Sequence, residues 1–408
     1  MEDSWRARSN LTINLGLRWD LIEPWSEKYD SIQTIVPGRQ SVLYPNAPLG
    51  LLVAGDPGIP STLSPSQFHN FAPRIGLAYS PSFQNGFLKK VFGDGGKTSI
   101  RASYGEFYTA FQGLSAGVMY GVPPFGYNYL SPTPPLFAQP FINAGNGAVE
   151  TDPYPFTFPP HNVTRQNPYT QFNFASVIPI SAAPYFYYRN QTPYTENYMF
   201  SIQRQFTRNA LLTVSYAGNQ GHHLLVTVPT NTGNPALCLS LSQPSEVMPG
   251  SSTCGPFGES GAYTSASGRV YQGTRLELGP NYGPVTAQQT IGNSNYNALE
   301  TNLRVTVGKR STVLLAYTYS KSIDDASNLG EQINPLNQRL TRVISSWDMK
   351  HNFVGTYTYR LALRPLLQEQ PAHGRMEPLG HNPVEFGTPR NFIRRLGSIA
   401  ARDTGQRF

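Results

Sequence analysis

Hydrophobic and polar residues alternate without a break over residues 10–21. The odd positions from Leu11 to Leu21 are all apolar, whereas the even positions from Asn10 to Asp20 are polar residues or glycine. A period of two predicts a β-strand with one apolar and one polar face. The segment is longer than the about five or six residues of a globular strand and suits the about nine to eleven of a tilted membrane strand.

The same alternation recurs in seven further segments. They are residues 71–80, 99–104, 197–206, 212–217, 299–307, 312–320 and 352–361. The connections between successive segments differ greatly in length. Residues 207–209 and 308–310 are of hairpin length, residues 81–97 are intermediate, and residues 22–70, 109–193, 218–294 and 321–351 form long connections. Alternating short and long connections are typical of an outer-membrane barrel, in which turns lie on the periplasmic side and loops outside.

The pattern therefore predicts an all-β fold: an antiparallel transmembrane β-barrel segment of about eight strands, belonging to a larger barrel with long extracellular loops. The apolar face is expected to meet lipid and the polar face the lumen. The residues chosen as lipid-facing are Leu15, Leu17, Trp19, Leu77, Phe200, Leu303, Val305, Leu315 and Tyr317. Those chosen as lumen-facing are Arg18, Arg74, Arg101, Glu300 and Arg304.

Aromatic residues stand near the ends of many predicted strands. They are Trp19, Tyr79, Tyr108, Tyr194, Tyr216, Tyr296, Tyr319 and Tyr359. Such residues collect where lipid tails meet water, so this distribution favours an aromatic girdle on the apolar face over a plain preference of tyrosine for strands. The long loops carry aromatic strings at 120–127 and 184–188. These strings would either stack on a ligand or pack on one another as a lid.

Composition narrows the function classes. Charged residues make up only 13% of the 408 residues, while Gly, Pro, Tyr and Phe are abundant, and no apolar run reaches the roughly 18 to 20 residues of a membrane helix. The chain opens on Met1, Glu2 and Asp3, so an exported product would need a leader in addition. The net charge of +7 is scattered rather than clustered, which argues against a nucleic-acid partner.

Motifs for catalysis, nucleotide binding or a zinc site do not occur, so we expect a non-enzyme without cofactor or metal. Two candidate metal sites are weak. The adjacent His222 and His223 would point to opposite sides of a strand, and Asp324 with Asp325 lacks the spaced ligands of a calcium loop. Cys238 and Cys254 lie in one Ser-, Pro- and Gly-rich stretch and predict a local disulfide in an oxidising compartment.

Several strings resemble one known family. Residues 10–20, 71–79 and 316–324, together with residues 296–300 and 348–353, are similar to the barrel of the Oar-like TonB-dependent transporters. The resemblance covers about residues 10–361. It implies a 22-stranded barrel that is plugged by an N-terminal domain, energised by TonB and located in the outer membrane. This sequence shows about eight strands and neither a plug nor a TonB-contacting segment, so a TonB partner would require a plug supplied by the full-length protein.

These features divide the chain into a partial receptor-like barrel, residues 1–362, and a non-barrel tail, residues 363–408. In the tail, alternation stops and Arg, Pro, His and Gly dominate. The family continues here with a strand reading roughly Gly-Trp-Ser-Leu-Ser-Gly-Ile. The codons for Met376 and Glu377, read one base later, give Trp and then Ser or Arg. Allowed codons for the residues that follow continue as Leu-Ser-Gly-Ile. A frameshift near Leu363 explains this pattern, and a disordered basic terminus is the alternative.

The leading hypothesis is a receptor or transporter barrel fragment that contacts outer-membrane lipid and takes up or binds an unidentified ligand, such as a carbohydrate or peptide. Two rivals remain open: a surface-displayed or soluble all-β adhesin or carbohydrate-binding protein, and the non-functional remnant of a broken gene. The side to which the apolar stripe points separates the receptor barrel from the adhesin or carbohydrate-binding protein, because only a membrane protein exposes its apolar stripe on the outside of a curved sheet.

Overall fold

The structure is a computed structural model of the whole chain. It describes residues 2–62, 64–93, 95–111, 156–180, 185–234, 281–308 and 310–360, with short stretches between them at 113, 122–126, 137–142, 147, 236–237, 240, 263–264, 267–271, 275 and 278–279. The predicted tail, residues 363–408, and both cysteines lie outside the described residues.

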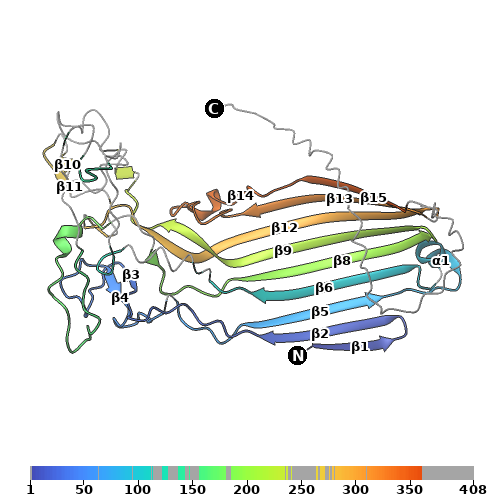
Figure 1. Cartoon of the computed structure of the whole chain (residues 1–408), viewed down its shortest axis with the longest axis horizontal. Helices are drawn as coiled ribbons and strands as arrows, with labels where there is room; N and C mark the ends of the chain where they lie inside the picture. Colours follow the sequence, from blue (N-terminus) through green and yellow to red (C-terminus); the bar gives the residue numbers. More distant parts are fainter. Residues whose placement is uncertain are drawn as a thin grey trace, which may run out of the picture.

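One antiparallel sheet dominates the fold (Figure 1). Its long strands are β1 (Glu2–Arg8), β2 (Leu11–Trp19), β5 (Phe71–Tyr79), β6 (Thr98–Tyr108), β8 (Tyr194–Thr207), β9 (Ala210–Pro229), β12 (Thr286–Val307), β13 (Ser311–Asp324) and β15 (His351–Tyr359). Each of them pairs with its neighbour in this sequence order, so the sheet is a simple up-and-down meander. The predicted antiparallel all-β fold is confirmed.

Short connections gather at one end of the sheet and long ones at the other (Figure 1). The turns that follow β1, β8 and β12 lie at the same end as α1 (Gly86–Phe92), which stands between β5 and β6. The described parts of the long connections, residues 20–70, 109–193, 230–285 and 325–350, lie at the opposite end. We call these the turn end and the loop end. The predicted sorting of the connections is confirmed, and within the described residues no helix is both long and apolar enough to cross a membrane.

Two features of the strands differ from the prediction. The sequence pattern missed β1, whose side chains are polar apart from Trp5 and Ala7, because the hairpin to β2 rests on backbone pairing and not on an apolar stripe. It also ended the central strands too early. At about 3.3 Å per residue the 22 residues of β12 span roughly 70 Å, well beyond the roughly 25 Å apolar band of a membrane barrel.

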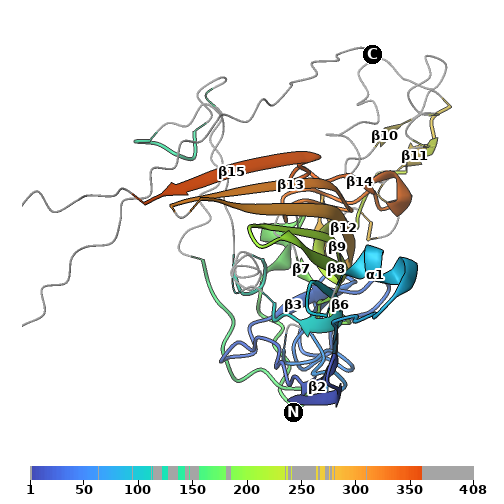
Figure 2. The ribbon, with the colours of Figure 1, turned by 90° about the vertical axis from the view of Figure 1, so that its right-hand side faces the viewer.

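The sheet is curved rather than flat, as the view along the strands shows (Figure 2). In the described residues it ends at β1 on one side and at β15 on the other, and every residue of β15 is exposed. Two short strands extend it at the loop end: β7 (Tyr185–Phe186) runs parallel to β12, and β14 (Val343–Ile344) pairs with β13.

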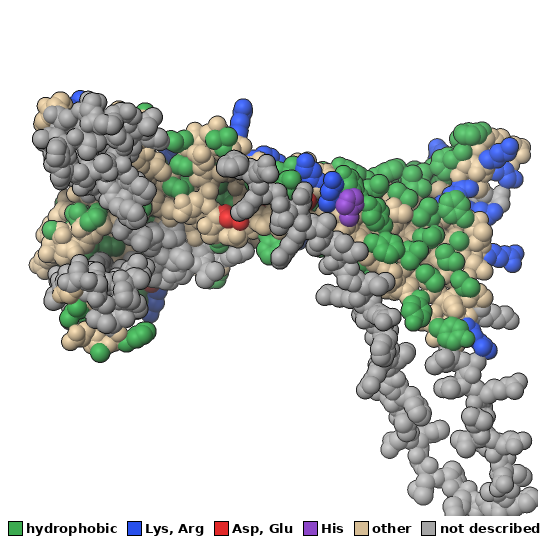
Figure 3. Space-filling view, turned by 90° about the horizontal axis from the view of Figure 1, so that it is seen from above, with side chains coloured by type: hydrophobic (Ala, Val, Ile, Leu, Met, Phe, Trp, Pro, Cys, Tyr) green, Lys and Arg blue, Asp and Glu red, His purple; other side chains and the backbone are tan. Residues whose placement is uncertain are grey.

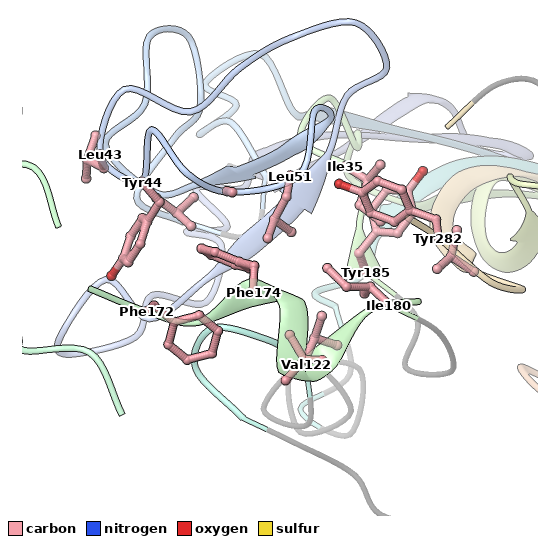
Figure 4. Close-up of a cluster of buried hydrophobic side chains, with 14 of the residues drawn as sticks. Ile35, Leu43, Tyr44, Leu51, Val122, Phe172, Phe174, Ile180, Tyr185 and Tyr282 are labelled. Atoms are coloured by element: carbon pink, nitrogen blue, oxygen red, sulfur yellow. The ribbon is translucent and has the colours of Figure 1, made fainter. Parts of the chain in front are cut away.

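The buried core lies at the loop end, where β7, β9 and β12 contribute Tyr185, Val226, Val228 and Ala287 to it. It includes the hairpin of β3 (Gln33–Ile35) and β4 (Leu51–Val53) and the 3-10 helix η2 (Phe174–Val177). A second short hairpin, β10 (Tyr263–Thr264) with β11 (Val270–Tyr271), and the 3-10 helix η3 (Gln338–Leu340) complete the elements. Figure 4 shows side chains from residues 20–70, 109–193 and 230–285 gathered in one space. We call this packed unit, which is built from the described parts of residues 20–70, 109–193 and 230–285, the cap.

Candidate functional site: sheet faces and cap

The register of the sheet fixes which side chains share a face. Residues directly opposite each other in an antiparallel pair lie on the same side. Leu77, Ala102, Phe200, Tyr216 and Leu299 form one continuous row across five strands. All nine residues predicted to face lipid lie on the side of this row, which we call the apolar face. Most of them are well exposed, with Trp19 at 55%.

The five residues predicted to face the lumen lie together on the opposite side, the polar face. Arg101, Ser201, Ser215 and Glu300 form a row across four strands, and the Ser215 hydroxyl donates a hydrogen bond to the Ser201 hydroxyl at 3.1 Å. Both serines are buried, whereas the apolar face is open. Small side chains on this side leave space for its charged groups.

Arg74, on the polar face, contacts Glu2 and Phe107. Its guanidinium donates to Glu2 Oε1 at 3.0 Å and stands 4.7 Å from the centroid of the Phe107 ring. A hollow of about 500 Å³ opens beside it, lined also by Asn14 and Asn197. Arg18, by contrast, pairs with its near neighbour Asp20 at 2.7 Å at the loop end. The polar face therefore carries fixed charge beside an open hollow.

One aromatic residue was assigned to the wrong face. Tyr296 stands opposite Asn219 and Ser322, and Asn219 stands opposite Asn197. These partners belong to the polar face, so Tyr296 cannot be part of a girdle on the apolar side. Alternation over Leu299 to Val307 places the even-numbered positions of β12 on the polar face. The same alternation extended back to Tyr296 would have placed this residue on the polar face.

The cap is built from segments far apart in the sequence. Its largest cluster of buried side chains comprises Ile35, Leu43, Tyr44, Ala47, Leu51, Val53, Val122, Phe172, Phe174, Val177, Ile180, Tyr185, Tyr282, Val285 and Ala287. Tyr185 and Phe186 of the aromatic string 184–188 are both buried, and the described part of string 120–127 contributes Val122. Of these two strings, Tyr185, Phe186 and Val122 therefore pack within the buried clusters of the cap.

Two polar side chains, Asp56 and Asn231, hold the cap backbone in place. Asp56, only 1% exposed, accepts hydrogen bonds from the backbone N–H groups of Val42, Leu43 and Val53. Asn231 donates to the carbonyls of Tyr282 and Gly283, both at 3.0 Å. The sequence analysis missed these residues. The run Gly55-Asp56-Pro57-Gly58 is a turn signature that would have marked Asp56.

Asn190 connects the cap to the sheet. Its side chain donates to the Gln288 carbonyl at 2.9 Å and accepts from the Thr290 N–H at 2.9 Å, both in β12. Gln67 reaches the Asn190 carbonyl from residues 20–70 at 3.3 Å. The side chain of Asn190 is buried, and its hydrogen bonds anchor the cap on β12.

A second hollow, of about 340 Å³, lies between two loops of the cap. The rings of Tyr29 and His161 stack at 4.0 Å beside it, and Asp30, Tyr44 and Arg165 also line it. Burial and the nearby Glu27 raise the pKa of Asp30, which favours the protonated carboxyl. For Glu27, burial raises the pKa, but hydrogen bonds from the Ser31 and Tyr29 N–H groups outweigh it and leave the pKa lowered. An aromatic pair next to donors and acceptors suits a polar ligand with a flat apolar side.

The weak metal candidates have other partners in the structure. His222 stacks on Tyr194 with centroids 4.9 Å apart, and its Nε2 lies 3.6 Å from Glu196 Oε1. Asp324 accepts from the Ser327 hydroxyl, and Asp325 accepts from the Asn293 N–H. Among the residues described, no three His, Cys, Asp or Glu side chains are grouped to hold a metal ion. The proposed disulfide, Cys238 with Cys254, lies outside these residues.

Comparison with known proteins adds a family to this geometry. The outer membrane beta barrel domain family matches residues 1–370. Three solved structures are similar in part: the outer membrane transporter YddB from Escherichia coli (10% identity, TM-score 0.31, 78% of this chain and 23% of that one), the siderophore receptor PirA from Pseudomonas aeruginosa (11%, 0.29, 79% and 35%), and the ferripyoverdine receptor of Pseudomonas aeruginosa bound to ferripyoverdine (9%, 0.32, 88% and 25%).

The three similar structures are named as transporters or receptors and none as an enzyme. This chain spans 23% to 35% of their lengths. No curated protein matches it. The family match and the meander of long strands confirm the predicted outer-membrane barrel and, with it, the location in the outer membrane. The chain belongs to the outer membrane beta barrel domain family.

Proposed function

We propose that this chain is part of the wall of a TonB-dependent receptor barrel, with its apolar face in lipid, its polar face toward the lumen and its cap outside the cell. The observation that carries the proposal is the exposed row of apolar residues that runs unbroken from Leu77 to Leu299 while serine, arginine and glutamate occupy the other face. Water would penalise such an exposed apolar surface, whereas lipid would not.

The cap is the proposed ligand-binding part, and the role is uptake or binding without catalysis. Its support is the hollow beside the Tyr29 and His161 rings, which offers stacking surface and hydrogen-bonding groups to a carbohydrate or a peptide. Coupling to TonB is proposed from the resemblance of the strand sequences and requires a plug in the full-length protein.

Accessibility to a lipid-soluble probe tests the orientation. Spin labels at Leu77→Cys and, as the matched control one residue earlier, Gly76→Cys report the two faces of β5 at the same depth. We expect the label at Leu77 to collide with oxygen dissolved in the bilayer and the label at Gly76 to collide with a water-soluble nickel chelate. Cys238 and Cys254 are replaced by serine in both variants. Reversed or equal collision rates in outer-membrane vesicles would overturn the proposal.

A further inference from the structure

The apolar face becomes polar as it approaches the loop end. Beyond Tyr216, β9 continues on this face with Gly218, Gln220 and His222, and β12 continues with Asn297 and Asn295. Asn297 accepts hydrogen bonds from the hydroxyls of Tyr198 and Tyr216. The same side of the sheet therefore passes from aliphatic residues through tyrosines to amides within one strand.

Residues 325–350 fold back over this polar stretch. The Gln338 side chain donates to the Ile291 carbonyl at 3.0 Å, and Arg342 Nη1 lies 3.4 Å from Asp325 Oδ1. Between this loop and the sheet is a cavity of about 390 Å³. We call it the outer-wall groove; its lining includes Gln220, His222, Asn295, Gln338, Arg339 and Arg342.

The charge around the outer-wall groove is mainly positive. Arg342 is partly balanced by Asp325, and His222 stands beside Glu196. Arg339 makes no ion pair with any residue that the structure describes, and Lys321 is exposed one step nearer the apolar rows, opposite Asn297. Figure 3 shows Lys and Arg side chains along the border between the hydrophobic half of the sheet and the loops, next to a histidine.

The loop that closes the groove also exposes large apolar side chains. These are Leu336, Leu340, Val343, Ile344, Trp347 and Met349. Trp347 is 78% exposed although its indole N–H donates to the Ser327 carbonyl at 3.1 Å. Exposed apolar groups beside unpaired cationic groups suit an amphiphile that carries negative charge.

We propose that the outer-wall groove binds the phosphate of a phosphorylated glycolipid of the outer leaflet, whose acyl chains lie along the apolar face. This inference rests on the proposed membrane orientation. Toward the loop end the groups change from aliphatic residues to tyrosines along β9 and β13, and then to Lys321 of β13 and the arginines of residues 325–350. This order matches that of acyl chain, interface and phosphate in such a lipid. Guanidinium groups bind phosphate with two parallel hydrogen bonds, and the amides of Gln220, Asn295 and Gln338 suit sugar hydroxyls.

Titration of the purified full chain in detergent micelles with lipid A, followed by native mass spectrometry, tests the proposal. Arg339→Gln is the first variant, because Arg339 has no ion pair to break among the residues that the structure describes. We expect binding of bisphosphorylated lipid A to weaken about fivefold in Arg339→Gln and about thirtyfold when Arg342→Gln is added. The control variant, Arg208→Gln with Arg310→Gln, removes the same charge at the turn end and should bind as the wild type does.

The outcomes separate this inference from the proposed function. Equal binding by wild type and Arg339→Gln, equal binding of dephosphorylated lipid A, or full displacement by inorganic phosphate would overturn the groove as a lipid site. Reconstitution into phosphatidylcholine nanodiscs is measured in parallel. A wild-type chain that does not enter the bilayer would overturn the orientation itself, whereas a chain that enters it without preferring lipid A would overturn only the groove.

Discussion

The sheet exposes its apolar side chains, whereas the cap buries them. In the sheet, Leu15, Leu17 and Trp19 are about half exposed, while in the cap Leu51, Leu52 and Tyr282 are 1% exposed or less. A chain surrounded by water must bury its apolar side chains against itself, as the cap does. The sheet leaves them open because its proposed solvent is lipid. On this proposal, one polypeptide contains two regions folded for two different solvents.

The two regions also differ in what fixes the backbone. β12 and β13 are paired in unbroken register from Ser294 with Asp324 to Val307 with Ser311, so the sheet is held by its backbone ladder. The cap has few strands and relies on side chains such as Asp56 and Asn190 to satisfy backbone groups. Side-chain substitutions should therefore damage the cap more than the sheet, except where they place charge in lipid.

The largest expected effect is loss of a buried ring in the cap. Tyr282 is fully buried, and its hydroxyl donates to the Pro48 carbonyl at 3.2 Å. Tyr282→Ala should cost about 3 to 5 kcal/mol of the free energy of unfolding, because it leaves a large cavity. Tyr357→Ala, at an 82% exposed position of β15, is the matched control in the sheet. Equal costs of the two substitutions in a urea titration would contradict the contrast between the two regions.

Charge on the apolar face should have the next largest effect. Leu15→Arg or Leu303→Arg in an assembled barrel should cost about 2 to 4 kcal/mol near the midplane of the membrane. Asn14→Arg and Asn302→Arg, on the polar face, should be far milder. A folding titration into lipid vesicles measures the difference, and equal losses on the two faces would exclude lipid contact.

The cysteines bear on the comparison because they fall within residues 230–285, the connection between β9 and β12. If residues 230–285 lie outside the cell, Cys238 and Cys254 should be oxidised in the exported parent protein and stabilise that loop by about 3 kcal/mol. Mass spectrometry after non-reducing purification tests the bond. Two free thiols would contradict the prediction, and a reductant should weaken protease resistance in the cap without changing the sheet.

The smallest expected effect is a change in stability at acidic pH. The folded-state pKa of Glu27 lies below its ordinary value of 4.5, so its contribution to stability is present above that value. That contribution is lost as pH falls below 4.5 and through the lowered pKa. Glu27→Gln should flatten this part of the pH dependence of thermal unfolding while leaving the sheet unchanged. An unaltered acid profile in the variant would show that Glu27 does not stabilise the cap.

Prediction from the sequence succeeded for the strands in which apolar and polar residues alternate with a period of two. Alternation located eight strands and separated the nine residues of the apolar face from the five of the polar face, since a period of two maps directly onto the sides of a sheet. It failed for β1, which carries no apolar stripe, and for the loop-end half of β9, where residues 218–223 interrupt the stripe. Without such a stripe, pairing depends on neighbouring strands that local sequence does not identify.

The sequence by itself determined the strands, the faces and the end at which the loops lie, because these follow from local periodicity and connection length. Only the tertiary structure decided the cap and the outer-wall groove. Tyr44, Phe174 and Tyr282 come from three separate loops and meet in one cluster. Arg339 and His222 lie more than a hundred residues apart and line one cavity. Such contacts arise from packing between distant segments, which no period in the chain encodes.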